Sequence, residues 1–218
     1  MKKQLAKLTL SSLSMIAIFI CASCIQDEDI APQAETTPRT TIGTGGFSLW
    51  TTCGSNAYVS GNNIVVPVGT GCGTKVNAAQ ANNSIYGSNW YCNASINGGS
   101  GAYSGASEMA IFTCDNVSSW NGNEMGFVRT LSDGVLKAYL QGGGAYIYTV
   151  VSAGSSYKCS ATSAHKVDFY VNEGYRTSLT NNSGNYQNRN YYFVATNHYY
   201  GGGNPANWAI TFNSANVW

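Results

Sequence analysis

The chain has 218 residues with a formal net charge of +1, and only 10% of its residues are charged. Tyr (15) and Gly (25) are abundant. Disordered chains are rich in charge and poor in aromatic residues, so this composition excludes disorder for the body of the chain. The balanced charge also lacks the basic footprint of a nucleic-acid-binding protein, so no nucleic-acid partner is expected.

Residues 1–23 have the features of an export signal peptide. Three lysines stand among the first seven residues, Leu8–Ile20 is apolar, and small residues precede Cys24. The apolar stretch is too short to predict a membrane span. The sequence therefore predicts an exported protein.

The end of this segment resembles a bacterial lipoprotein signal, with Cys24 as the lipidated residue. It departs from that family at Cys21, where an aliphatic residue is preferred, and an ordinary signal cleaved after Ser23 is the alternative. The acidic run Ile25–Asp29 is similar to the surface-export signal of lipoproteins in Bacteroidota, or else begins a solvated linker. The resemblance implies a surface-exposed outer-membrane lipoprotein that contacts the membrane only through its lipid.

Residues 24–44 contain Pro, Thr and Ala without an apolar period, which predicts a flexible tether. Residues 45–218 are then expected to form a single domain. Export favours disulfides, but an odd number of cysteines leaves at least one thiol unpaired. The five downstream cysteines are Cys53, Cys72, Cys92, Cys114 and Cys159. Because no two of them lie within four residues of each other, a thiolate metal site is not expected, and neither is a cofactor.

Short apolar and polar alternations cut by turn residues predict strands along most of the domain. Ile64–Val68 contains Pro67 and is expected at a sheet edge. Val76–Asn83 is the one segment after the signal with helical character. The other predicted strands before the central region are Phe47–Thr52, Ser88–Ile96 and Glu108–Cys114, and those near the end are Tyr191–Thr196 and Trp208–Phe212.

The region Glu124–Thr180 has the clearest alternation. One face of its strands is apolar and the other is polar, and Asn172–Gly174 is expected to close a hairpin. The apolar positions are Leu136, Ala138, Leu140, Val167, Phe169 and Val171; the polar ones are Lys137, Tyr139, Gln141, Lys166, Asp168 and Tyr170. Turns about every ten residues and the lack of helices predict an all-β, antiparallel β-sandwich.

The order of segments in residues 124–218 resembles the concanavalin A-like lectin/glucanase jelly rolls. The residues that carry the resemblance are Gly126–Val128, the Asp133-Gly134 turn into Val135–Gln141, the His165–Asn172 strand with its hairpin, and the closing Trp208–Trp218. It implies a curved front sheet that holds a glycan, backed by a second sheet. By itself it implies no activity.

Sugar hydrolysis needs two carboxyl groups that flank one bond. Glu108 opens EMAIF and is similar to the nucleophile strand of one glucanase branch, but no Asp or Glu follows Glu173 to serve as the acid. The other glucanase signature, two Glu and an Asp spaced along one strand, is absent. Glu108 and Glu124 on neighbouring strands remain the candidate catalytic pair.

Aromatic side chains beside amides favour neutral glycans, because a ring contacts the C–H face of a sugar while amides orient its hydroxyls. Tyr is also a good strand residue, so most of these rings are expected to be structural. The candidate ligand-binding residues are Tyr139, Gln141, Tyr170, Tyr191, Asn197, His198 and Tyr199.

Three functions remain open. The sequence favours a surface-anchored, lectin-like β-sandwich whose partner is a glycan or polysaccharide. The first alternative is a glycoside hydrolase or polysaccharide lyase of the same fold that uses Glu108 and Glu124. The second is a structural or adhesive surface protein. The missing late carboxylate favours binding over catalysis.

Overall fold

The structure is a computed structural model of two antiparallel sheets. The residues that it describes are 38–51, 57–68, 74–97, 108–118, 122–130, 133–200 and 208–218. Within them the one helical element is the 3-10 turn η1 (Thr44–Gly46), and no helix there has the length and apolarity to cross a membrane. Residues 1–23, Cys24, Cys53 and Cys72 lie outside this part of the chain, so the predicted signal and lipid anchor remain predictions.

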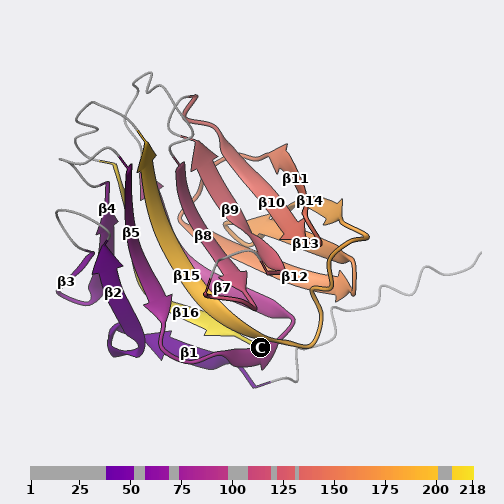
Figure 1. Cartoon of the computed structure of the whole chain (residues 1–218), viewed down its shortest axis with the longest axis horizontal. Helices are drawn as coiled ribbons and strands as arrows, with labels where there is room; N and C mark the ends of the chain where they lie inside the picture. The colour runs from indigo at the N-terminus through magenta and orange to yellow at the C-terminus, as the bar shows by residue number, and fades with distance from the viewer. Residues whose placement is uncertain are drawn as a thin grey trace, which may run out of the picture. The chain divides into compact units, whose positions relative to one another are not determined.

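We name the two layers the back sheet and the front sheet (Figure 1). The back sheet contains, in spatial order, β14 (Gly174–Thr180), β13 (Lys166–Val171), β12 (Ser156–Ser163), β7 (Asn89–Asn97), β16 (Ala209–Val217), β4 (Asn63–Pro67) and β3 (Tyr58–Ser60), with β1 (Thr40–Gly43) paired to β16. The front sheet contains β11 (Ala145–Val150), β10 (Leu136–Gly142), β9 (Glu124–Thr130), β8 (Glu108–Cys114), β15 (Arg189–Tyr200), β5 (Thr74–Ala81) and β2 (Phe47–Thr51), with β6 (Ile85–Gly87) paired to β15. Within the described residues neighbouring strands pair antiparallel throughout, which confirms the predicted sandwich.

The core lies between the sheets and is made by alternate residues of both. Trp90 of the back sheet packs edge-on against Phe127 and Phe193 of the front sheet, with ring centroids 6.0 and 5.4 Å apart. All three side chains are fully buried. Edge-on aromatic pairs of this kind add to the stabilisation that burial of their large apolar surfaces provides. This aromatic centre holds the front sheet in place over the back sheet.

The faces predicted for the central region are confirmed. Leu136 and Leu140 are buried in the core, whereas Lys137 between them is half-buried on the outer side. The predicted hairpin is also confirmed, because Asn172 and Glu173 both have positive φ (53° and 63°) between β13 and β14. Two positive φ values define the turn whose twist matches that of paired strands.

Two local predictions are wrong. Residues 76–81 belong to β5 and not to a helical turn, because β5 pairs with β15 on one side and with β2 on the other. β4 is not an edge strand as predicted, because it lies between β16 and β3. β3 pairs only with Asn63–Val65, however, so Pro67, the last residue of β4, lies beyond β3 and pairs only with Ala209 of β16. In β5 strand pairing overrides a local preference, whereas Pro67 stands where the missing N–H costs no bond to β3.

The sandwich begins earlier than residue 45. β1 lies in the segment predicted to be a tether, where Ile42 is buried and Thr41 pairs with Asn216. The Thr41 hydroxyl also donates to Asn216 Oδ1 at 2.7 Å. The last residues of that segment are therefore part of the fold.

Cys92, Cys114 and Cys159 are buried free thiols. No disulfide joins cysteines in the described part of the chain, so the predicted pairing is not supported for these three. Cys92 and Cys159 pack in the core between the sheets. A buried Cys behaves as a small apolar residue, which accounts for their positions.

Candidate functional site

The outer face of the front sheet carries the candidate site, and strand register sets its layout. Glu124 lies between Gln141 on β10 and Cys114 on β8. Two residues further along β9, Gly126 lies between Tyr139 on β10 and Phe112 on β8. Side chains directly opposite each other in such rows have Cβ atoms about 4.5–5.5 Å apart. Residues from five strands are thereby brought onto one surface.

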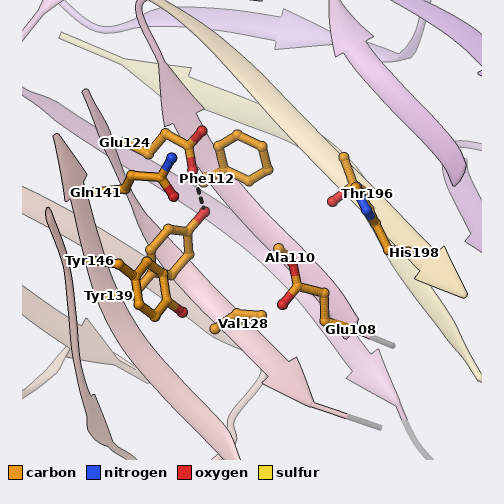
Figure 2. A pocket seen from close by; sticks show the side chains of 10 residues that line it. All are labelled: Glu108, Ala110, Phe112, Glu124, Val128, Tyr139, Gln141, Tyr146, Thr196 and His198. Carbon is orange, nitrogen blue, oxygen red and sulfur yellow. Dashed lines mark hydrogen bonds between the residues drawn. The ribbon is translucent and has the colours of Figure 1, made fainter. Parts of the chain in front are cut away.

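A pocket of about 120 Å³ opens on this face (Figure 2). It is lined by Glu108, Ala110, Phe112, Glu124, Val128, Tyr139, Gln141, Tyr146, Thr196 and His198. Pockets that enclose a drug-sized ligand usually exceed about 300 Å³. This one is smaller, so a ligand would rest against its walls instead of being enclosed.

Gly126 makes the depression possible. A Cβ at this position would lie 2.4 Å from the Ile111 carbonyl oxygen and 2.4 Å from the Phe112 Cβ. The rings of Phe112 and Tyr139 instead lie on either side of the glycine, with centroids 6.3 Å apart. A glycine is required here because any side chain would clash with β8. Its missing side chain leaves a depression between the two rings.

Glu124 lies at one end of the pocket and is only 5% exposed. The Tyr139 hydroxyl donates to its Oε2 at 3.2 Å (Figure 2). Burial raises the pKa of Glu124 to about 8, and the charges of Glu108 and Asp115 act in the same direction. The hydrogen bond from Tyr139 opposes this rise. Glu124 is therefore mostly a neutral carboxylic acid at pH 7, able to donate as well as accept.

Glu108 lies at the other end, directly across from His198 on β15. Burial raises the pKa of Glu108, and the positive charge of Lys137 opposes the rise. Burial lowers the pKa of His198, which favours the neutral imidazole. This end of the pocket thus combines a carboxyl group with a ring that is uncharged at neutral pH.

A row of aromatic rings leads from the pocket to the edge of the sheet. Phe112 and Tyr139 are followed by Tyr146, whose ring centroid is 5.4 Å from that of Tyr139, and by Tyr148 at 5.7 Å from Tyr146. Tyr146 and Tyr148 are 46% and 54% exposed on the edge strand β11. Lys137 Nζ lies 5.0 Å from the Tyr148 ring centroid. These four rings, which we call the aromatic row, offer an apolar platform beside polar groups.

The two candidate catalytic carboxyl groups are brought into one pocket but lie at its opposite ends. Glu108 pairs with Thr130, and Glu124 with Cys114, so six residues of strand separate them. At roughly 3.3 Å per residue their Cα atoms are about 20 Å apart. Glycosidases hold their two carboxyl groups about 5–9.5 Å apart. Side chains must extend toward each other along the strands to approach that range.

The strand that carries Glu108 contributes one carboxyl group. Its alternate, pocket-facing positions are Glu108, Ala110 and Phe112. Among the described residues, no three His, Cys, Asp or Glu side chains are grouped so that they could hold a metal ion. The pocket walls are thus mainly aromatic, amide, hydroxyl and carboxyl groups.

The structure separates the predicted ligand-binding residues into four sets. Tyr139, Gln141 and His198 line the pocket. Tyr191 and Asn197 are fully buried between the sheets, where Asn197 Nδ2 donates to the Val66 carbonyl oxygen at 3.3 Å. Tyr170 lies on β13 of the back sheet, so it does not share a face with Tyr139. The side chain of Tyr199 lies outside the described residues.

The candidate ligand-binding residues chosen from the sequence did not include Phe112, Tyr146 and Thr196, although Tyr146 belongs to the aromatic surplus that suggested a glycan. A signal for Phe112 was present, because Glu108 and Phe112 are four residues apart in one strand and must share a face. Tyr146 shares its face with Tyr148 for the same reason. What the period alone cannot show is which strand lies beside which.

Comparison with models of known protein families and with curated protein sequences gives no match. Solved structures do match. A β-glucanase from Bacillus licheniformis aligns with a TM-score of 0.52 at 11% identity, covering 84% of this chain and 98% of that chain. A prokaryotic β-1,3-1,4-glucanase (lichenase) derived from a mouse hindgut metagenome aligns with a TM-score of 0.56 at 5% identity, covering 83% and 99%. A native glycosidic hydrolase aligns at 0.55 and 10% identity, covering 83% and 95%.

These likenesses establish the fold class. The chain is an antiparallel β-sandwich with the jelly-roll fold of concanavalin A-like glucanases, as the sequence predicted. At such low identity they establish the fold alone. The function must be argued from the site.

Proposed function

We propose that this protein binds a neutral glycan on the outer face of its front sheet. The observation that carries the proposal is the aromatic row, which begins in the pocket and continues onto the exposed rings of Tyr146 and Tyr148. A flat ring contacts the apolar face of a sugar, and a few polar groups beside it fix the orientation. Gln141 and Thr196 supply such groups from the pocket wall.

The charge state of the pocket supports a neutral ligand. Glu124 is mostly protonated at pH 7, because burial raises its pKa to about 8. The lowered pKa of His198 leaves that ring uncharged. Neutral donors and acceptors suit hydroxyl groups. Lys137 lies beside the pocket and not among its lining residues, and its charge acts on Glu108, so the pocket wall itself offers an acidic sugar no cation.

The similar structures suggest which glycan to test first. One of them is named as a β-1,3-1,4-glucanase, and such a glucan is a neutral polymer. We therefore take mixed-linkage β-glucan as the first ligand for this chain. Binding is preferred to hydrolysis because β8 carries a single pocket-facing carboxyl group and Glu124 lies six residues of strand away from it.

Hydrolysis is the second candidate, and one observation favours it. A glycosidase needs one carboxyl group that is protonated at neutral pH, and Glu124 has that property while sharing a pocket with Glu108. In this alternative Glu124 is the acid and Glu108 the nucleophile or base. Release of reducing ends that is lost in both Glu108→Gln and Glu124→Gln would support it over simple binding.

Isothermal titration calorimetry with oligosaccharides of mixed-linkage β-glucan, alongside an array of neutral and acidic glycans, tests the binding proposal. Replacing Tyr146 with Ala should weaken binding about tenfold, which is about 1.4 kcal/mol. Tyr175→Ala is the matched control, since Tyr175 is 57% exposed on the back sheet. If no glycan binds, or if both variants bind equally well, the proposal fails and a structural or adhesive role takes its place.

We further propose that the protein is anchored at the cell surface through a lipid on Cys24. The support is the sequence of residues 1–29, with its basic start, apolar stretch, terminal Cys and following acidic run. Cell fractionation of Cys24→Ser tests this proposal. Release of the variant from the membrane fraction is expected, and its retention there would disprove lipid anchoring.

A further inference from the structure

A second hollow of about 340 Å³ opens at the other end of β15. It is lined by Tyr86, Asp115, Asn188, Arg189 and Asn190, none of which lines the pocket described above. We propose that this hollow is a second binding site for a neutral sugar. The choice of a neutral sugar rests on the proposed function, and the experiment below distinguishes binding at the hollow from binding at the pocket.

Two of the residues that line the hollow, Tyr86 and Asn190, lie on the same face of the front sheet as the pocket. Asn190 is an even number of residues from Thr196 on β15, so the two side chains point the same way. Tyr86 pairs directly with Asn190 across β6 and β15. Six residues from Asn190 to Thr196 correspond to about 20 Å of strand. Tyr86 and Asn190 are therefore separated from Thr196 of the pocket by about 20 Å of strand, and the hollow is a distinct site.

Its chemistry is that of a sugar site. Tyr86 is 63% exposed, although large apolar side chains gain by burial. The side chains of Asn188 and Asn190 are exposed beside it. The Asn190 amide offers donors and an acceptor, whereas Asn188 Oδ1 already accepts from Ser88 Oγ at 3.4 Å, so Asn188 contributes mainly its Nδ2 donors. A ring for the C–H face and two amides for the hydroxyl groups form a combination suited to a carbohydrate.

The charges at the base of the hollow cancel. Arg189 Nε donates to Asp115 Oδ2 at 2.6 Å, and the two side chains are 35% and 10% exposed. This bond uses one of the five N–H donors of the guanidinium, so the remaining donors are available to hydroxyl oxygens. The negative charge of Asp115 already neutralises the positive charge of Arg189. The pair therefore attracts an acidic sugar little, and a neutral ligand is favoured.

The hollow is also held rigidly before any ligand arrives. Asp115 accepts bonds from the backbone N and the Nδ2 of Asn123, both at 2.8 Å. Gly122 allows this contact, since a Cβ there would lie 1.9 Å from Asp115 Oδ1. On the other side, the Asn188 backbone N donates to Ser88 Oγ at 2.8 Å. Preformed groups lose little entropy on binding, which favours recognition of a small sugar.

The test is a titration of the ¹⁵N-labelled protein, followed by NMR, with glucose, galactose, mannose, N-acetylglucosamine and mixed-linkage β-glucan oligosaccharides. We expect the side-chain signals of Asn188, Asn190 and Arg189 to shift with at least one of these sugars. Tyr86→Ala should weaken the affinity measured from these shifts about tenfold. Tyr175→Ala, which removes a similarly exposed ring from the back sheet, should leave that affinity unchanged. Asn190→Ala provides a second variant that removes only an exposed amide.

Shifts confined to Gln141 and its neighbours would overturn the second site while supporting the proposed function. Shifts at Asn188 and Asn190 that survive Tyr86→Ala unchanged would also overturn it. If no sugar shifts any signal on the front sheet, both proposals fail. Shifts at the hollow without shifts in the pocket would support the second site and count against the first.

Discussion

The Tyr139 hydroxyl donates a hydrogen bond of 3.2 Å to the carboxyl group of Glu124 across the neighbouring strands β10 and β9. Both residues are nearly fully buried, although they lie on the outer face of the sheet. A carboxyl group in this position is poorly hydrated, so its neutral form is favoured. The same hydrogen bond thus joins β9 to β10 and influences the pKa of a carboxyl group in the pocket.

Replacing Glu124 with Gln should remove a pH dependence of stability. Burial raises the pKa of Glu124 from 4.5 to about 8, so the folded state holds a proton that the unfolded state has lost between those values. The stabilisation is complete below about pH 4.5 and is lost as the pH rises toward 8. Each pKa unit corresponds to about 1.4 kcal/mol, so the total is of the order of a few kcal/mol.

Urea unfolding at several pH values between 5 and 9 measures this effect. The free energy of unfolding of the wild type should fall with pH more steeply than that of Glu124→Gln. Glu173→Gln, in the exposed hairpin turn, should keep the wild-type slope. Identical slopes for all three proteins would mean that Glu124 titrates normally.

Tyr139→Phe should raise the pKa of Glu124 further. The hydroxyl of Tyr139 favours the charged carboxylate, so its loss removes the one hydrogen bond that opposes the effect of burial. The ring of the aromatic row is retained. A ¹³C NMR titration of the Glu124 carboxyl carbon should show a higher midpoint in Tyr139→Phe than in the wild type or in Tyr148→Phe. An unchanged midpoint would mean that the hydroxyl does not donate to Glu124, and a lower one that it favours the protonated acid.

Gly126→Ala should destabilise the protein by about 1–3 kcal/mol, because the new methyl group meets backbone and Cβ atoms of β8 at 2.4 Å. Gly43→Ala is the control, since a Cβ there meets nothing within 4 Å. Urea unfolding of the two variants should therefore differ clearly. Equal stability would show that β8 and β9 can separate at this point without cost.

The three described cysteines should resist alkylation in the folded protein. Cys92, Cys114 and Cys159 are fully buried, and burial raises the pKa of each thiol, so little reactive thiolate forms. Iodoacetamide labelling followed by peptide mapping should modify these positions only after denaturation. Rapid labelling of Cys114 in the native protein would show that the floor of the front sheet opens readily.

Much of the fold follows from local sequence. The alternation in Leu136–Gln141 assigns each residue to a face, and Asn172–Gly174 defines a hairpin, because strand period and turn geometry are short-range properties. The same reasoning cannot assign β15. Its sequence from Tyr191 to Tyr200 has aromatic or polar residues at both parities, so the inward set, which includes Tyr191 and Asn197, could not be told from the outward set, which includes His198.

By itself, the sequence determined the fold class, a β-sandwich of alternating strands, and a composition with many aromatic residues and little charge; the export signal stays a prediction. Only the tertiary structure decided which residues meet. It placed Tyr139 and Tyr170 on different sheets, brought Glu108 and Glu124 to opposite ends of one pocket, and created a second hollow from Tyr86 and Asn190. The physical reason is that a face is encoded by every second residue, whereas neighbouring strands are chosen by long-range pairing across the whole chain.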